Sequence, residues 1–404
     1  MVGLKGSFQS MRSLNRSLIL HIIRQNGPIS RAEIARQTRL SPPAVGNIVS
    51  GLLDSSLICE SKQGVSSGGR KPVMLMINSR QFFIIGLDIG SFQLKAVISD
   101  LNGSIFKKIT RRIPQNIEKE QLILFIKDSV HDLKEASDLT DEAIMGIGIG
   151  MHGVVDWENG ISLFAPNLGL RDIPLKEELE LEFQMPVRVE NDVSAQAMGE
   201  LWFGNGSGLD TFVCINVGRG VGAGVIVDRK LHRGSSFISG EIGHMAIDLK
   251  GPKCTCGSHG CLQSFTSGPS LAEAVKRKII LGNQSSLSEE FSGNLSAIDG
   301  EAICRAAENG DVLSRSALRQ AGRYLGIGIT NLIHTINPSR IIIGGGVANA
   351  GGLLLNAMKE SIRQRALTNH AKETEIELSQ LGGDATVLGA VSLILDEMFA
   401  VQDG

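Results

Sequence analysis

In the first 80 residues, apolar residues recur at helical spacing in three short segments. From residue 11 to residue 25, leucines and isoleucines recur at helical spacing, and the turn sequence at 26–28 stops that helix. A second helix is predicted at 30–38. A third begins after Ser41, with Pro42 at the first-turn position where a missing N–H group costs nothing. The apolar side chains of the third helix share one face: Val45, Ile48, Val49, Leu52 and Leu53.

Two further apolar segments, at 57–60 and 73–77, are predicted to be strands, and the loop SSGGRKP lies between them. Three helices and a two-stranded wing make a winged helix-turn-helix, whose third helix enters the major groove of DNA. At the start of the second helix we expect Ser30 and Glu33 to form a capping box. In such a box each side chain accepts a hydrogen bond from the other residue's backbone N–H group.

The rest of the chain runs through one pattern of apolar segments twice. The first pass begins with a buried strand at 83–89 and a hairpin signal at Asn102-Gly103, and it ends in a strand at 187–190. The second pass begins with a strand at 211–217, which runs into the glycine-rich segment 218–224. The pattern predicts two similar α/β lobes with a cleft between them.

A length of 404 residues predicts two or three domains. We place them at 1–80, 81–203 and 204–404, and we expect the last helix to pack back on the first lobe. No stretch of ~18 apolar residues is present, which excludes a membrane-spanning helix. The N-terminus lacks the apolar run of a signal peptide, so a cytoplasmic protein is expected.

The net charge of −2 conceals an asymmetry along the chain. Residues 1–80 hold 11 Lys and Arg against 3 Asp and Glu, a balance of +8, and the remaining residues therefore balance at −10. A basic head on an acidic body is typical of a module that binds a polyanion, joined to a domain of another kind. A winged helix that binds protein is the alternative, and the positive charge argues against it.

Four candidate metal ligands gather within 18 residues: His244, Cys254, Cys256 and Cys261. Cys and His donors with glycines and a proline between them predict a tetrahedral zinc site with no open position, so the metal is expected to be structural. Three of the six cysteines fall within eight residues, which ordinary buried thiols would not explain. His259 is a spare donor in a turn sequence, and we leave it out.

The run GEIGHM at 240–245 and the run CTCGSHGCL at 254–262 resemble the ROK family (repressors, open reading frames, kinases). The resemblance extends over nearly the whole chain. It implies the actin-like, ribonuclease-H-like sugar-kinase fold for the two lobes. In the head, SR-x-E-IA and GGR-x-P resemble the winged helix of the family's repressors.

The resemblance implies a sugar site, made by Gly153, Asn167, Asn191, Asp192, Glu241, His244 and Gln263. Asp192 matches the catalytic base of the family's kinases. Gln263 stands where the family has a glutamate, and because an amide still donates and accepts hydrogen bonds, we expect a sugar to bind with an altered preference. The stretch at 239–254 is most like the family's xylose regulators.

The two loops that bind ATP phosphates in the family's kinases have an altered sequence in this chain. Kinases of the family carry Asp-x-Gly-Gly-Thr-Lys after the first strand, whereas this chain reads DIGSFQ at 88–93, which puts side-chain bulk where phosphates approach the backbone. In the second phosphate loop, Arg219 stands between Gly218 and Gly220. An intact sugar side with an altered ATP side indicates a sensor that is not an enzyme and does not use ATP.

The leading hypothesis is therefore a sugar-responsive repressor of carbohydrate-utilisation genes that binds operator DNA as a homodimer or tetramer. DNA contacts are expected from Arg31, Arg36, Ser41, Pro43, Asn47, Arg70 and Lys71. Where the family's repressors usually place Lys, Thr and Ser after the cap, this chain has Pro42, Ala44 and Gly46. The alternatives are an ATP-dependent hexose or N-acetylhexosamine kinase, and a DNA-binding protein whose signal is a protein or a phosphosugar held by Arg219.

Overall fold

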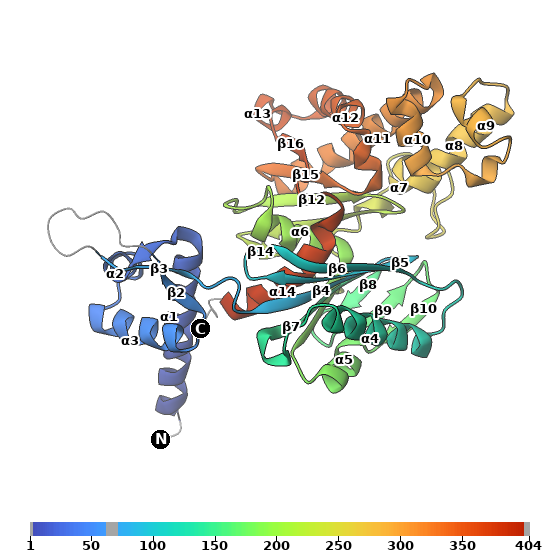
Figure 1. Cartoon of the computed structure of the whole chain (residues 1–404). Helices are drawn as coiled ribbons and strands as arrows, with labels where there is room; N and C mark the ends of the chain where they lie inside the picture. The colour runs from blue at the N-terminus through green and yellow to red at the C-terminus, as the bar shows by residue number, and fades with distance from the viewer. Residues whose placement is uncertain (1–2, 62–71, 400–404) are drawn as a thin grey trace.

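The computed structural model describes residues 3–61 and 72–399. It begins with a winged helix domain that lies beside a two-lobed body (Figure 1). A three-stranded antiparallel sheet, in the order β1-β3-β2, forms the base of the wing. The elements of this domain are α1 (Gly3–Asn26), β1 (Ile29–Ser30), α2 (Arg31–Thr38), α3 (Pro42–Asp54), β2 (Ile58–Ser61) and β3 (Met74–Ile77).

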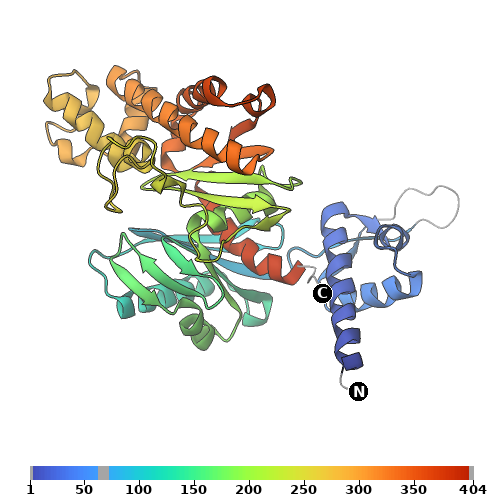
Figure 2. The ribbon, with the colours of Figure 1, turned by 180° about the vertical axis from the view of Figure 1, so that it is seen from behind.

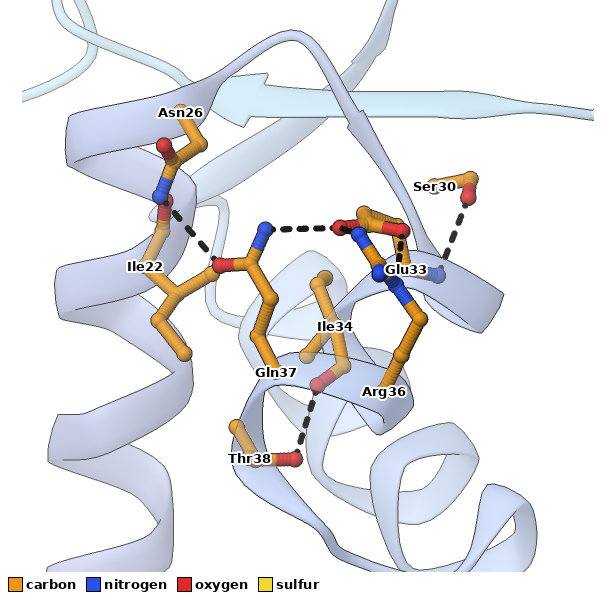
Figure 3. Close-up of polar contacts among 8 residues, drawn as sticks. All are labelled: Ile22, Asn26, Ser30, Glu33, Ile34, Arg36, Gln37 and Thr38. Carbon is orange, nitrogen blue, oxygen red and sulfur yellow. Dashed lines mark hydrogen bonds and ion pairs between the residues drawn. The ribbon is translucent and has the colours of Figure 1, made fainter.

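The caps of α2 and α3 follow from the sequence, with one correction. Ser30 Oγ accepts the backbone N–H of Glu33 at 3.2 Å, and Ser41 Oγ accepts that of Ala44 at 3.4 Å. The second hydrogen bond of the expected capping box, from the backbone N–H of Ser30 to the Glu33 carboxylate, does not form. This carboxylate accepts hydrogen bonds from Arg36 and Gln37 instead (Figure 3), because an arginine one turn along the helix offers a charged partner.

The first lobe of the body is a five-stranded mixed sheet in the order β11-β7-β4-β5-β6. Figure 1 shows α4 and α5 on its outer face. The elements of this lobe are β4 (Phe83–Ile89), β5 (Gln93–Asp100), β6 (Ile105–Arg112), α4 (Lys119–Glu135), β7 (Ile144–Met151), α5 (Leu175–Phe183) and β11 (Val187–Asn191). A small antiparallel sheet lies at one edge, formed by β8 (Val154–Asp156), β9 (Ile161–Ala165) and β10 (Leu170–Ile173).

The second lobe is also a five-stranded mixed sheet, in the order β14-β13-β12-β15-β16, and a layer of helices covers its outer face (Figures 1 and 2). Its strands are β12 (Phe212–Val217), β13 (Val221–Val227), β14 (Lys230–Leu231), β15 (Arg340–Gly344) and β16 (Glu375–Leu378). The longer covering helices are α8 (Gly268–Ile280), α10 (Gly300–Glu308), α11 (Val312–Ile336) and α12 (Gly352–Arg365). The expected α/β fold with a winged helix and two lobes is confirmed.

Two helices, α6 (Asp192–Phe203) and α14 (Ala385–Phe399), lie between the two sheets (Figures 1 and 2). They cross backbone to backbone, since a Cβ added at Gly389 would come 1.8 Å from the carbonyl oxygen of Ala195. The other face of α6 packs against β13. There a Cβ at Gly224 would come 2.4 Å from that of Ala197, and this glycine of the glycine-rich segment is a strand residue of β13.

Glycines also let α14 lie directly on the sheet of the first lobe. A Cβ at Gly148 in β7 would come 1.7 Å from the carbonyl oxygen of Ala390, and one at Gly86 in β4 would come 2.5 Å from that of Val387. The last helix of the chain is therefore part of the core of the first lobe. Within the described residues, we find no helix that is both long and apolar enough to cross a membrane.

We predict that Gly148→Ala lowers the free energy of unfolding by about 1–3 kcal/mol or more, because backbone atoms cannot move aside as a flexible side chain does. Gly51→Ala in α3 is the control, since an added Cβ there meets nothing within 4 Å. Denaturant unfolding measures both. Equal stability of Gly148→Ala and the parent protein would show that α14 does not lie this close to β7.

Candidate functional site: an interlobe cavity beside a zinc-type cluster

A cavity of about 1860 Å³ separates the two lobes. It brings together all seven of the residues predicted to bind sugar: Gly153, Asn167, Asn191, Asp192, Glu241, His244 and Gln263. The first four come from the first lobe and from the start of α6, and the last three from the second lobe. A ligand that contacts both groups would hold the lobes together.

Three strands of the first lobe end at this cavity. In the parallel register, Asn191 of β11 pairs with Met151 of β7, and Asp88 of β4 pairs with Gly150. The residues that follow, Asp192 and His152, therefore lie at one edge of the sheet together with Asp88. The carboxyl ends of neighbouring parallel strands are where ligands bind in open α/β sheets.

Asn191 is the N-cap of α6. Its Oδ1 atom accepts the backbone N–H groups of Val193 at 2.9 Å and Ser194 at 3.0 Å. Its Nδ2 group donates to the carbonyl oxygen of Gly153 at 2.9 Å and to Asp192 Oδ1 at 3.0 Å. Both polar atoms of Asn191 thus have partners in the chain, and this side chain fixes the positions of Gly153 and Asp192 on the cavity wall.

Three carboxyl groups in the cavity resist ionisation. Burial, together with the neighbouring Asp192, raises the pKa of Asp88 to about 7. Burial also raises the pKa of Asp192 itself, which nearby His152 offsets only in part. On the second lobe, burial raises the pKa of Glu241. A carboxyl group that resists ionisation can donate as well as accept a hydrogen bond, which suits a neutral ligand with hydroxyl groups.

The four predicted metal ligands lie together, with all their donor atoms within 4.8 Å of one another. Cys254 Sγ is 3.7 Å from His244 Nδ1, and Cys256 Sγ is 3.8 Å from Cys261 Sγ. A zinc ion with Zn–S bonds of about 2.3 Å places two tetrahedral sulfurs about 3.8 Å apart, so the donor set fits zinc. It would hold the ion with four protein atoms and leave no position for water.

The thiols of this cluster differ in acidity. Burial raises the pKa of Cys254, but hydrogen bonds from the backbone of Cys256 and from Gln263 outweigh it and lower this pKa to about 5. Burial and the two neighbouring thiols raise the pKa of Cys261 to about 12. Crowded thiols cannot all ionise without a cation among them, which is what a divalent metal supplies.

The cluster forms part of the cavity wall. His244 Nε2, the ring nitrogen turned away from the thiols, is 3.9 Å from Glu241 Oε2. Gln263 Nε2 donates to Cys254 Sγ at 3.3 Å and to Thr255 Oγ1 at 3.2 Å. The Gln263 amide, which was predicted to bind sugar, therefore also holds the loop of metal ligands at the cavity wall.

The two altered phosphate loops face each other across the cavity. Phe92, 47% exposed, extends from the first lobe, and the Arg219 guanidinium of the second lobe lies 5.4 Å from the centre of its ring. Both side chains line the cavity. They lie in the two loops where the sequence departs from the pattern expected of a kinase of the family.

In the winged helix, Ser41, Pro43 and Asn47 lie exposed on the face of α3 opposite its buried Val45 and Val49. The two predicted arginines of α2 have acidic partners. Arg31 is 3.4 Å from Glu60, and Arg36 is 2.6 Å from Glu33. The predicted contacts Arg70 and Lys71 lie outside the described residues.

Comparison with known proteins matches residues 84–397 to the ROK family and residues 12–58 to a winged helix-turn-helix DNA-binding domain. The chain belongs to the ROK family. The xylose repressor of Caldicellulosiruptor bescii is 32% identical to this ROK protein over 98% of this chain and 99% of that one. The xylose repressor of Bacillus subtilis is 33% identical over 96% of both chains.

Solved structures agree with this assignment. A ROK family transcriptional regulator, a homologue of the Escherichia coli Mlc protein, has a TM-score of 0.85 at 29% identity and covers 96% of this chain and 97% of its own. A ROK family glucokinase from Streptomyces griseus, in complex with glucose and AMPPNP, has a TM-score of 0.69 at 34% identity. It covers 77% of this ROK protein and 98% of its own chain, so its likeness does not extend over the whole molecule.

Sequence reasoning missed one cross-lobe ion pair. Arg233 of the second lobe donates from Nε to Glu190 Oε2 at 2.7 Å, and Glu190 is buried directly before Asn191. The Arg233 guanidinium also lies 4.2 Å from the centre of the Trp157 ring. The available signal was an acidic residue near the end of the predicted strand, but its partner lies 43 residues away in sequence.

We predict that purified protein of this chain carries about one zinc ion and that Cys254→Ser lowers both the zinc content and the unfolding temperature, because a structural site contributes directly to folding. Elemental analysis and thermal unfolding measure the two effects. Cys59→Ser, in β2 and outside the cluster, is the control that should retain its zinc. Full zinc content in Cys254→Ser would exclude this thiol as a ligand.

Proposed function

We propose that this ROK protein is a sugar-responsive transcriptional repressor, which binds operator DNA through its winged helix and a free sugar in the interlobe cavity. The repressors of C. bescii and B. subtilis match it along nearly their full length, and their names make xylose the first sugar to test. A regulator of this kind acts on DNA in the cytoplasm. The zinc ion would be structural.

The observation that carries this proposal is the position of α6. Its N-cap Asn191 and its first residue Asp192 lie at the cavity wall, and its last turn contacts the winged helix domain. Twelve residues at about 1.5 Å each make the helix about 18 Å long. One rigid element therefore connects the proposed sugar site with the proposed DNA-binding domain.

The contact at the far end of α6 is specific. Arg24 of α1 donates from Nη2 to the carbonyl oxygen of Trp202 at 3.2 Å, and its guanidinium lies 3.7 Å from the centre of the Trp202 ring. Phe399 of α14 lies near both, with its ring centre 5.8 Å from that of Trp202 and 5.9 Å from the Arg24 guanidinium. Burial lowers the pKa of Arg24 to about 10, so this cation is largely desolvated.

A sugar bridging Asp192 and Glu241 would favour one angle between the lobes. Because α6 lies between the lobes and ends at Arg24, a changed angle would alter how α1 docks on the body. In a homodimer or tetramer, which the proposal includes, such a change moves paired recognition helices away from the spacing of two operator half-sites. The sugar would then weaken DNA binding.

The kinase alternative has less support. It needs phosphates seated between the two glycine loops, where Phe92 and Arg219 now lie. Asp192 alone can accept a proton from a hydroxyl, but without a seated γ-phosphate no transfer follows. We therefore propose that the body binds sugar without phosphorylating it.

We predict that the protein binds DNA from upstream of its own gene at ~100 mM salt and that saturating D-xylose weakens this binding by about tenfold or more. Fluorescence anisotropy measures the DNA affinity, with D-glucose and N-acetylglucosamine as further sugars. Asn47→Ala is the control: it should lose DNA affinity and keep the thermal stabilisation by sugar.

Two results would contradict the proposal. Absence of DNA binding with and without every sugar would remove the repressor function. Release of ADP in a coupled assay with ATP and any of these sugars would favour the kinase.

A further inference from the structure

His152 is a buried residue of the cavity wall to which neither the sequence motifs nor the proposed mechanism assigns a role. Only 6% of the residue is exposed, and it lines the cavity. Its Nδ1 atom is 3.1 Å from the carbonyl oxygen of Ile89, and its backbone N–H group donates to the same oxygen at 3.3 Å. Its Nε2 atom has no hydrogen-bond partner among the described residues.

An unpartnered buried nitrogen is unusual, because the large majority of buried side-chain polar atoms have a hydrogen-bond partner. A carbonyl oxygen can only accept, so the Nδ1 atom of His152 must carry a hydrogen, which it donates to the carbonyl oxygen of Ile89. In a neutral ring, Nε2 is then an acceptor. Neither Asp88 nor Asp192 forms a hydrogen bond with Nε2, so no described residue of the chain supplies the missing donor.

The ring is held in place before any ligand arrives. Ile89 fixes it from one side through two hydrogen bonds. On the other side, the next residue, Gly153, has a left-handed backbone with φ of 92° and is tied to Asn191 through its carbonyl oxygen. A Cβ at Gly153 would lie 2.1 Å from the carbonyl oxygen of Phe164, so only a glycine fits in this closely packed turn.

The position of His152 relative to Asp192 follows from strand register. Met151 and Asn191 are partners in the β7–β11 pair, so the two following side chains start from neighbouring strand ends, about 4.8 Å apart. Two fixed acceptors at this separation suit two hydroxyl groups on one sugar ring.

We propose that His152 is a specificity-determining residue of the sugar site, whose Nε2 atom accepts a hydrogen bond from one hydroxyl of the bound sugar while Asp192 binds another. This inference rests on the proposed sugar binding. It makes one hydroxyl obligatory, because a sugar without that hydroxyl leaves Nε2 buried and unpaired. A purely structural imidazole would impose no such requirement.

The test compares sugar affinity in the full-length wild type and in His152→Leu by isothermal titration with D-xylose and D-glucose. We expect His152→Leu to bind about tenfold to a hundredfold more weakly. His152→Gln should recover part of the loss, because its amide oxygen can accept. Ser162→Ala is the matched control: Ser162 Oγ is likewise buried without a partner but lies outside the cavity wall, so its loss should leave the affinity unchanged.

A ligand series identifies the contact itself. Monodeoxy analogues of whichever sugar binds are titrated into wild type and His152→Leu. One analogue should lose affinity relative to its parent sugar in the wild type and bind as well as the parent in His152→Leu. Zinc content and unfolding temperature of each variant show that it is folded.

The outcomes separate the two proposals. If neither sugar binds the wild type, the proposed sugar binding falls, and this inference with it. If sugar binds wild type and His152→Leu equally, or if every deoxy analogue loses the same factor in both, sugar binding stands and the role of His152 is overturned.

Discussion

The close crossing of α6 and α14 is the constraint on which the rest of the structure depends. Gly199 and Gly389 let the two backbones touch, and Gly148 lets α14 rest on the first sheet. Because backbone atoms meet without intervening side chains, neither helix can shift without moving the sheets on both sides. The cavity residues at the start of α6 and the docking of α1 at its end are therefore placed by one packing arrangement.

Much of this arrangement could be predicted from the sequence, because its signals are local. Ser41-Pro42 marks the start of α3, and the short spacing from Cys254 to Cys261 brings the thiols together with little help from the fold. The positions of Asp192 and Glu241 were expected from motifs. Both line the cavity, Asp192 beside the first lobe and Glu241 on the second lobe.

The rest could not be predicted, because it depends on partners distant in the chain. Gly224 could be seen only as part of a glycine-rich segment, and the structure shows that it is a strand residue that gives room to α6. Glu33 was expected to cap its helix, but Arg36 competes for the same carboxylate. His152 comes next to Asp192 only because β7 pairs with β11, and no short window of sequence contains both strands.

The central claim is that the sugar site and the DNA-binding domain communicate through α6 and the Arg24–Trp202 contact. The most direct measurement is the ratio of DNA affinities without and with sugar in Arg24→Ala, taken together with the sugar affinity of the same variant. The account predicts an unchanged sugar affinity and a ratio that falls toward one, because the coupling free energy is lost while both sites persist. A ratio equal to that of the wild type would contradict it.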